Sequence, residues 1–366
     1  RLATLLHQVA DGLFARPSLC VQPGVHYEAG RAVQLTRVAA EEFPRVFVSP
    51  DVVAAALGVE RPALDVRGAA AGLAPDLDIL IRSSTNPLLL LEYHRGFTHS
   101  LLFAPLGALA CAASLHRWTW AYLAFRRSYL FCLLGYASHC LLDACTSYGT
   151  ELLWPFSSER TAWSIVSVVD PAFTLPLLVL VVLAVRRGRA SYARGAAVWA
   201  LAYLGLGAIQ LQRAETVGSA NARERGHTPV RLEAKPALGT LLLWKVIYEH
   251  DGHYYVDAVR VALDSKVYPG ANIAKVDVAR DFSWLDSASR QAADVERFRR
   301  VADDFLGLEA RTGLIVDIRY SMVPNEIAGF WGIALDPDAP RDAHVKFVPT
   351  VETTPADVAR LVEMVF

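Results

Sequence analysis

The stretch EYHRGFTHSLLF, residues 92–103, places two histidines and an arginine directly before an apolar run that extends to about residue 115. Charged and strongly hydrated side chains are costly in apolar segments, so their presence there usually serves a function. Three further apolar runs follow, at about 128–145, 164–185 and 195–212. Each approaches the roughly 20 apolar residues with which a helix crosses a bilayer. The pattern therefore predicts a helical, multi-pass membrane domain.

The composition of the 366-residue chain agrees with a membrane protein, because 53% of its residues are hydrophobic. A buried helix of a large soluble protein is the alternative for any one run, but four runs in succession weaken it. The formal net charge of −1 provides no basic field, so we expect no nucleic-acid partner. The five cysteines form no CxxC pair, which argues against a disulfide framework and a thiolate zinc site.

The chain divides into three parts by composition. Residues 1–66 contain both apolar and charged stretches, and we can assign no function to them. Residues 67–213 form the predicted membrane domain, and residues 214–366 have the composition of a soluble domain. In this last part, LLLWKVIYEHDGHYYVDAVRVAL predicts two strands around the turn HDGH, which is a hairpin signal rather than a metal site. GLIVDIRYSMV and IAGFWGIAL predict two more strands, and RQAADVERFRRVADDFLGL a helix. The predicted fold class is thus mainly α, with polytopic membrane helices followed by a C-terminal α+β extramembrane domain.

Arginines cluster in two connections between the predicted helices. They are Arg117, Arg126 and Arg127 in one connection, and Arg186, Arg187, Arg189 and Arg194 in the other. Such clusters mark cytoplasmic loops. Alternation of the helices then places residues 93–98, residues 143–165 and the C-terminal domain on the opposite, periplasmic side.

Two pairs of candidate ligands follow from helical spacing. His139 and Asp143 are four apart near the end of an apolar run, which puts both on one helix face. His94 and His99 are five apart, and a continuous helix would splay them by about 140°. They converge only if a helix begins between them, and Thr98 is the predicted N-cap.

A third pair, Asp76 and Asp78 in APDLD, precedes the point at which the chain enters the first predicted membrane helix, near His94. Both carboxylates could reach one ion from an irregular loop. The predicted orientation brings all six side chains to one membrane face. Three imidazoles and three carboxylates suit Zn²⁺, Mn²⁺ or Fe²⁺, whereas the histidines argue against Mg²⁺ and Ca²⁺. Six donors exceed the four of a closed structural zinc site, so the sequence predicts an open catalytic site with one or two ions, most simply zinc.

The polar blocks HRGFTHSLLF, GYASHCLLDACTSYGTELLWPFS and APDLD, together with DPAFTLPLL, resemble the bacterial inner-membrane metal-dependent hydrolases of the YdjM type over about residues 66–211. The resemblance implies a multi-pass inner-membrane protein with a hydrolase site. Its ligand candidates, carried over by position, are Asp76, Asp78, His94, His99, His139 and Asp143. Residues 1–66 do not match the start of the family, and the C-terminal domain occurs in only part of it.

A site at the membrane face leads us to expect a membrane lipid or lipid-linked substrate and ester or phosphoester cleavage. Asp143, or an unligated Asp76, is a candidate general base. Arg95 could hold a phosphate or carboxylate of the substrate, and anchoring to lipid headgroups is its alternative role. The residues that follow His139 and Asp143 on the same side could support the ligands or form a second metal site; they are Thr146, Ser147, Glu151 and Asp170.

Two other classes of function stay open. The same side chains could store or transport a metal without catalysis, although transport should require ionisable groups deep in several helices. Alternatively, the metal could hold together a membrane scaffold whose periplasmic domain binds a protein partner. In that scaffold, loss of the metal should destabilise the fold, whereas in an enzyme Asp143→Asn should remove activity from a protein that stays folded.

Overall fold

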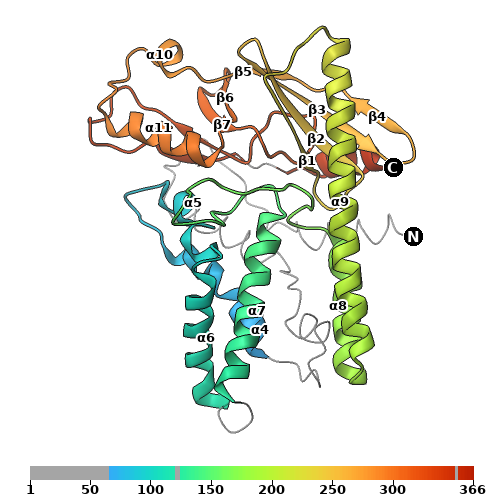
Figure 1. The fold of residues 1–366 in the computed structure, drawn as a ribbon. Coiled ribbons are helices and arrows are strands. Elements are labelled where there is room, and N and C mark those ends of the chain that lie inside the picture. The colour runs from blue at the N-terminus through green and yellow to red at the C-terminus, as the bar shows by residue number, and fades with distance from the viewer. Residues whose placement is uncertain (1–65, 120–123, 351–352) are drawn as a thin grey trace. The chain divides into compact units, whose positions relative to one another are not determined.

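The computed structural model describes residues 66–119, 124–350 and 353–366. The unassigned segment of residues 1–66 lies outside these ranges except for its last residue. The described residues belong to one compact unit, Val46–Phe366. Helices occupy its first part and antiparallel strands its second (Figure 1), so the prediction of helices followed by an α+β domain is confirmed.

Five longer helices form the first part of the fold. They are α4 (Val66–Leu73), α6 (Ala104–Thr119), α7 (Phe125–Ala144), α8 (Pro171–Arg187) and α9 (Ala190–Glu224). Helix α7 packs against α4 and α6, and α8 packs against α9. Small side chains allow the first three to approach closely, and a Cβ on Gly107 of α6 would lie only 2.4 Å from the Tyr136 ring of α7.

Three short elements lie between α4 and α6, and the helix expected from about residue 97 begins only at Ala104, after the last of them. They are the 3₁₀ helix η1 (Pro75–Leu80), α5 (Leu89–Tyr93) and the 3₁₀ turn η2 (Phe97–His99). The predicted irregular loop at Asp76 and Asp78 was therefore wrong, because both residues lie in η1. The predicted break between His94 and His99 is confirmed, but Thr98 lies inside η2 and is not its N-cap, which is Gly96.

The predicted run at 164–185 begins too early, because α8 starts only at Pro171. Asp170 caps this helix by accepting hydrogen bonds from the backbone N–H groups of Ala172 and Phe173, and proline suits the first helical position. Among the described residues, α9 alone is long and apolar enough to cross a membrane by itself. The bent pair Leu89–His99 with Ala104–His116 would add a second span if the two count as one. Multiple membrane crossings thus stay a prediction.

Helix α9 continues well past the apolar run that predicted it. Its 35 residues pass without a break through the expected domain boundary at residue 213. Near the end of that run, Gln210 donates hydrogen bonds to the carbonyls of Leu241 and Val261, and just beyond it Arg213 donates to that of Ala262. The membrane-type helices and the C-terminal domain are therefore joined by one helix and not by a linker.

The first sheet has the order β1-β2-β3-β4, with β5 also paired to β3, and every pairing is antiparallel. Its strands are β1 (Arg231–Pro236), β2 (Leu243–His250), β3 (His253–Val261), β4 (Ser265–Tyr268) and β5 (Asn272–Ala274). Asp251 and Gly252 connect β2 to β3 with φ of 49° and 69°. Positive φ at both positions is typical of a two-residue hairpin, so the predicted turn is confirmed.

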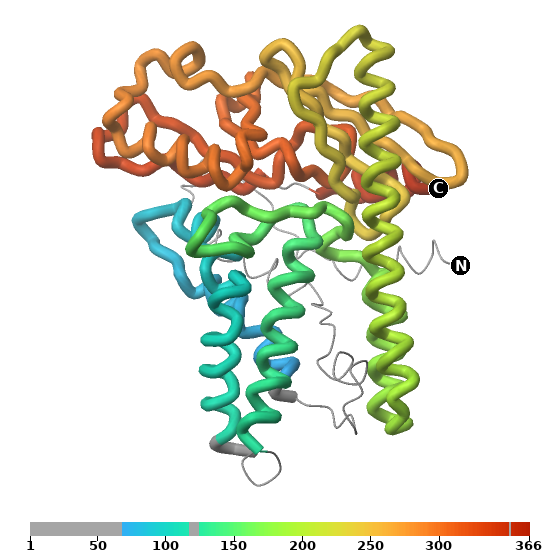
Figure 2. The backbone as a smooth tube through the Cα atoms, in the orientation of Figure 1, coloured from blue at the N-terminus to red at the C-terminus, as the bar shows by residue number. Residues whose placement is uncertain are grey.

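The second sheet has the order β6-β7-β8-β9 and is also antiparallel. It consists of β6 (Leu306–Glu309), β7 (Leu314–Asp317), β8 (Trp331–Ala334) and β9 (Lys346–Pro349). The helices of this part of the chain are α10 (Val278–Asp281), α11 (Arg290–Val301) and α12 (Pro355–Val365), and α12 packs against β2 and β3 of the first sheet. The predictions of β7 and β8 are confirmed. The helix predicted over residues 290–308 is confirmed only as far as Val301, because the chain turns at Asp303 and Asp304, which have positive φ, and continues as β6. Figure 2 shows the α8–α9 connection and the adjoining ends of α6 and α7 at one end of this unit, away from the sheets.

Candidate metal site

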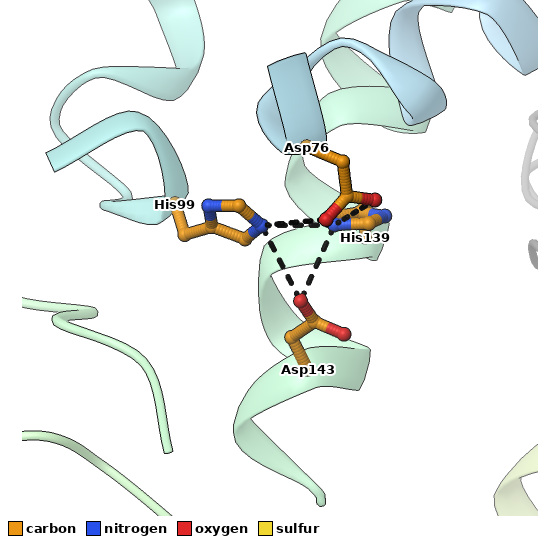
Figure 3. Close-up of side chains that lie close together, drawn as sticks. All are labelled: Asp76, His99, His139 and Asp143. Atoms are coloured by element: carbon orange, nitrogen blue, oxygen red, sulfur yellow. Dashed lines mark hydrogen bonds and ion pairs between the residues drawn. The ribbon is translucent and has the colours of Figure 1, made fainter. Parts of the chain in front are cut away.

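Four of the six predicted ligands converge where η1, η2 and the end of α7 meet. They are Asp76 from η1, His99 from η2, and His139 and Asp143 from α7. Their rings and carboxylates point toward one another (Figure 3), and one ligand atom from each lies within 4.8 Å of those of the other three. All four residues are buried. The helical spacing of His139 and Asp143 is thus confirmed as a shared face.

The distances between these ligand atoms form a narrow set. Nε2 of His99 lies 3.1 Å from Nε2 of His139, 3.3 Å from Oδ2 of Asp143 and 3.5 Å from Oδ1 of Asp76. Nε2 of His139 lies 3.3 Å from Oδ2 of Asp143 and 3.4 Å from Oδ2 of Asp76. Zinc binds nitrogen and oxygen at about 2.0–2.1 Å in a tetrahedron, whose edges are then about 3.3–3.4 Å. The five distances that involve the two imidazole nitrogens are close to the edges of such a tetrahedron, with both oxygens of Asp76 taking part.

The hydrogen-bonding state of the site also fits a cation. Two imidazole nitrogens at 3.1 Å can share only one hydrogen. Oδ2 of Asp143 is buried and lies 3.1 Å from Nε of Arg95 and 3.3 Å from Nε2 of both His99 and His139, but none of these contacts has acceptable hydrogen-bond geometry within the described ranges. A buried carboxylate is more stable where well-formed hydrogen bonds or a cation satisfy its oxygens. A metal ion bound by two nitrogens and two carboxylates would satisfy Oδ2, so the group could hold one.

Asp78 and His94 lie outside the group of four. Asp78 accepts hydrogen bonds from the backbone N–H of Arg95 and from the hydroxyl of Thr98, both at 2.9 Å. Its carboxylate also faces Nδ1 of His94 at 2.8 Å and Nδ1 of His99 at 3.2 Å. A carboxylate on Nδ1 of a histidine fixes the ring and turns Nε2 toward the metal. Asp78 is therefore placed to orient His99.

Arg95 faces inward, beside Asp143. Its Nε lies 3.1 Å from Oδ2 of Asp143, and its Nη1 donates a hydrogen bond of 2.8 Å to the hydroxyl of Thr146. The residue is 9% exposed. Its backbone has a φ of 60°, a left-handed conformation that side chains rarely adopt. The bonds of the Arg95 backbone to Asp78 and Glu151 hold this conformation in place.

Sequence reasoning missed Tyr136, which supports the His99 turn. Its hydroxyl donates a hydrogen bond of 2.8 Å to the carbonyl of Thr98. The available signal was its position three residues before His139, which places both on one face of α7. Of the candidate supporting residues, Thr146 contacts Arg95, whereas Asp170 caps α8 and bonds to the hydroxyl of Tyr203.

The exposure pattern around the site is the inverse of that of a water-soluble protein. In η1, Asp76 and Asp78 are 5% and 2% exposed, whereas Leu77 and Leu80 are 62% and 66% exposed. The same inversion follows η2, where His99 and Ser100 are fully buried and two leucines are exposed, Leu101 and Leu102. Exposed apolar surface of this extent marks contact with a membrane or a partner.

The comparisons with known proteins agree with this surface. Residues 49–214 match the family model of the YdjM inner membrane protein. The chain is 37% identical over 117 residues to inner membrane protein YbcI of Escherichia coli (strain K12). The aligned stretch covers 31% of this chain and 66% of that protein. It is 30% identical over 98 residues to the uncharacterized protein YfhP of Bacillus subtilis (strain 168), or 27% of this chain and 29% of that one. No solved structure is significantly similar. Residues 49–214 are therefore the part of the chain that is similar to the YdjM inner membrane protein family.

Proposed function

We propose that the protein is a membrane-embedded metal-dependent hydrolase whose site consists of Asp76, His99, His139 and Asp143. The observation that carries the proposal is the set of distances from Nε2 of His99 and His139 to each other and to the two carboxylates, 3.1–3.5 Å, in a buried cluster of two nitrogens and two carboxylates. The donor set favours zinc, with manganese and iron as alternatives. One group of four donors supports a single ion.

The side chains suggest how the reaction would be divided among them. A metal in such a site supplies Lewis acidity toward water and toward a carbonyl or phosphoryl oxygen. A metal-bound carboxylate is a poor general base, so Asp76 would act as one only in a state in which it has left the ion. The carboxylate of Asp143 is already engaged by Arg95, which makes it the weaker candidate. The contacts of Arg95 favour a role in orienting Asp143 over direct binding of substrate.

The substrate we propose is a membrane lipid or a lipid-linked ester or phosphoester. Its support is the inverted exposure of η1 and of the residues after η2, which surrounds the buried ligands with leucines. A substrate that reaches the site across this surface must itself have an apolar part. We place the site and the C-terminal domain on the periplasmic side of the inner membrane, because the arginine clusters at Arg126–Arg127 and Arg186–Arg194 favour a cytoplasmic location for the opposite end.

One observation favours a second candidate, a metal-stabilised scaffold. The four ligands come from three separate segments, so a bound ion would also fasten η1, η2 and α7 together. The two candidates differ in the effect of Asp143→Asn. An enzyme should lose activity while its melting temperature changes little, whereas a scaffold should melt at a lower temperature with and without substrate.

The first experiment is elemental analysis of the detergent-purified protein beside the double variant His99→Ala, His139→Ala. The matched control is His250→Ala, His253→Ala, which removes two histidines from the β2–β3 hairpin. We expect about one transition-metal ion per chain in the wild type and the control, and none in the first variant at an unchanged helical circular dichroism spectrum. If the wild-type protein binds no stoichiometric metal even after incubation with the metal ions, the hydrolase proposal is wrong.

A further inference from the structure

The C-terminal domain contacts the segment that directly follows the metal ligand Asp143. This rim segment, Cys145–Glu151, contains Tyr148, whose ring lies 6.5 Å from the ring of Tyr320 and 6.3 Å from that of Trp331, between centroids. The hydroxyl of Tyr320 also donates a hydrogen bond of 2.7 Å to the carbonyl of Ser147. Two residues of the C-terminal domain thus hold the backbone and a side chain of the rim segment.

The rim segment is in turn connected to the ligands. The guanidinium of Arg95 lies 5.3 Å from the centre of the Tyr148 ring and bonds to the hydroxyl of Thr146. That hydroxyl donates to the carbonyl of Asp143, and Nε of Arg95 faces the carboxylate of Asp143 at 3.1 Å. Stacked and cation–π contacts of this kind fix the orientation of an arginine. The contacts therefore run without a gap from Tyr320 to the metal ligand.

A second attachment holds the segment that leads into His94. Arg297 of α11 pairs with Glu92 at 2.6 Å and donates a hydrogen bond to the side chain of Asn86. Between them, Leu88 is 2% exposed and packs in the core of the C-terminal domain beside Val295 and Phe298. The segment that leads into His94 and the rim segment that follows Asp143 are thus both anchored in the C-terminal domain.

We infer that Tyr320 is a positioning residue for the metal site, so that the C-terminal domain is a structural part of the site and not a separate module. This inference rests on the proposed function only in that it requires a metal to bind at the site; it does not require hydrolase activity. Tyr320 acts on Asp143 through the rim segment and Arg95, and it contacts neither the ligands' metal-facing atoms nor a substrate. Loss of its hydroxyl should free the carbonyl of Ser147 and let Arg95 and Asp143 shift.

The test compares Tyr320→Phe with Tyr254→Phe in the full chain in detergent micelles. Tyr254 is the matched control, because its hydroxyl also donates to a backbone carbonyl in the C-terminal domain, that of Asp304, away from the rim segment. We titrate each protein with Co²⁺ and record its visible absorption bands. Removing a direct partner of a ligand typically costs about 10–100-fold in metal affinity, so for the more distant Tyr320 we expect about 3–10-fold and altered bands.

Amide hydrogen exchange of residues 144–151 provides a readout that needs no metal. It should be faster in Tyr320→Phe and unchanged in Tyr254→Phe. If the wild type binds Co²⁺ and Tyr320→Phe matches it in affinity and bands, the inference is wrong, and equal losses in both variants also overturn it. If the wild type binds no Co²⁺, the metal function fails, and the exchange comparison alone decides the role of Tyr320.

Discussion

Asp78 and Asp76 are two residues apart in η1, yet the structure gives them different surroundings. Asp76 faces Nε2 of both His99 and His139, whereas Asp78 faces Nδ1 of His99 and of His94. We expect Asp78→Asn to lower metal affinity by about 10–100-fold without changing the number of ions bound at saturation. Asp76→Asn should prevent stoichiometric binding. A chelator competition titration measures both, and the same loss of stoichiometry in the two variants would make Asp78 a ligand.

The sequence could identify the residue types of this site but not their final partners. The spacing of His139 and Asp143 fixes a shared helix face, and this prediction holds because α7 is regular through both residues. The segment from Asp76 to His99 contains two 3₁₀ turns, a five-residue helix and a left-handed residue at Arg95. No simple period relates side chains across such a path, so the choice between Asp76 and Asp78 as the inner carboxylate required the structure.

Lys245 of β2 provides a prediction for pH, because it is buried at 3% exposure. Burial lowers its pKa to about 7, while the charges of Asp317 and Glu326 act in the opposite direction. An unfolded lysine has a pKa of about 10.4, so between about pH 7 and 10 the unfolded state binds more protons than the folded state. Stability of the wild type relative to Lys245→Met should therefore rise with pH across this range. Thermal melts of both proteins at pH 7 and 9.5 measure it, and a constant difference would contradict the shifted pKa.

At the scale of the helix, α9 carries a stripe of small buried residues toward its neighbours. The stripe consists of Ala193, Ala196, Ala200, Gly207, Ala214, Gly218 and Ala222. Together with the buried Tyr203 and Gln210, these residues recur every three or four positions, and the recurrence continues beyond residue 212, where the apolar run ends. The end of the run set the predicted end of the helix, whereas the small-residue period gives its real extent. The start of α8 was missed for a related reason, since a cap and a proline define it and hydropathy does not.

Gly207 and Gly205 of α9 give a matched pair for testing this packing. A Cβ on Gly207 would lie 1.9 Å from the carbonyl oxygen of Ile165, whereas one on Gly205 would meet nothing within 4 Å. The backbone beside Ile165 is bonded to Cys145, just after Asp143. Gly207→Ala should lower the free energy of unfolding by about 1–3 kcal/mol or more through overpacking, and Gly205→Ala should leave it unchanged or raise it by up to about 1 kcal/mol. Thermal melts in detergent compare them, and equal stabilities would mean that the Ile165 turn can move away from α9.

At the scale of the whole molecule, the order of helical and β parts follows from composition and hydrophobic period. The strands β2 and β3 were predictable because a turn signal lies between two runs rich in β-forming residues. The short strands β5, β6 and β9, of three or four residues, are too brief to show a period. The attachment of the C-terminal domain to the site depends on contacts between residues far apart in sequence, such as Tyr320 with Ser147. Local patterns do not encode such contacts.

The crossing of the membrane by α9 gives the last prediction. If α9 spans the bilayer and the arginines near Arg187 stay in the cytoplasm, the α8–α9 connection and Phe366 lie on opposite sides. Alkaline phosphatase needs disulfides, which form in the periplasm and not in the cytoplasm. In a Gram-negative host, a fusion after Phe366 should be active and an insertion after Gly188 inactive, with immunoblots confirming equal expression. Activity only after Gly188 would reverse the orientation. Equal activity at both positions would contradict the crossing itself, and α9 would then be a helix that joins two domains on one side of the membrane.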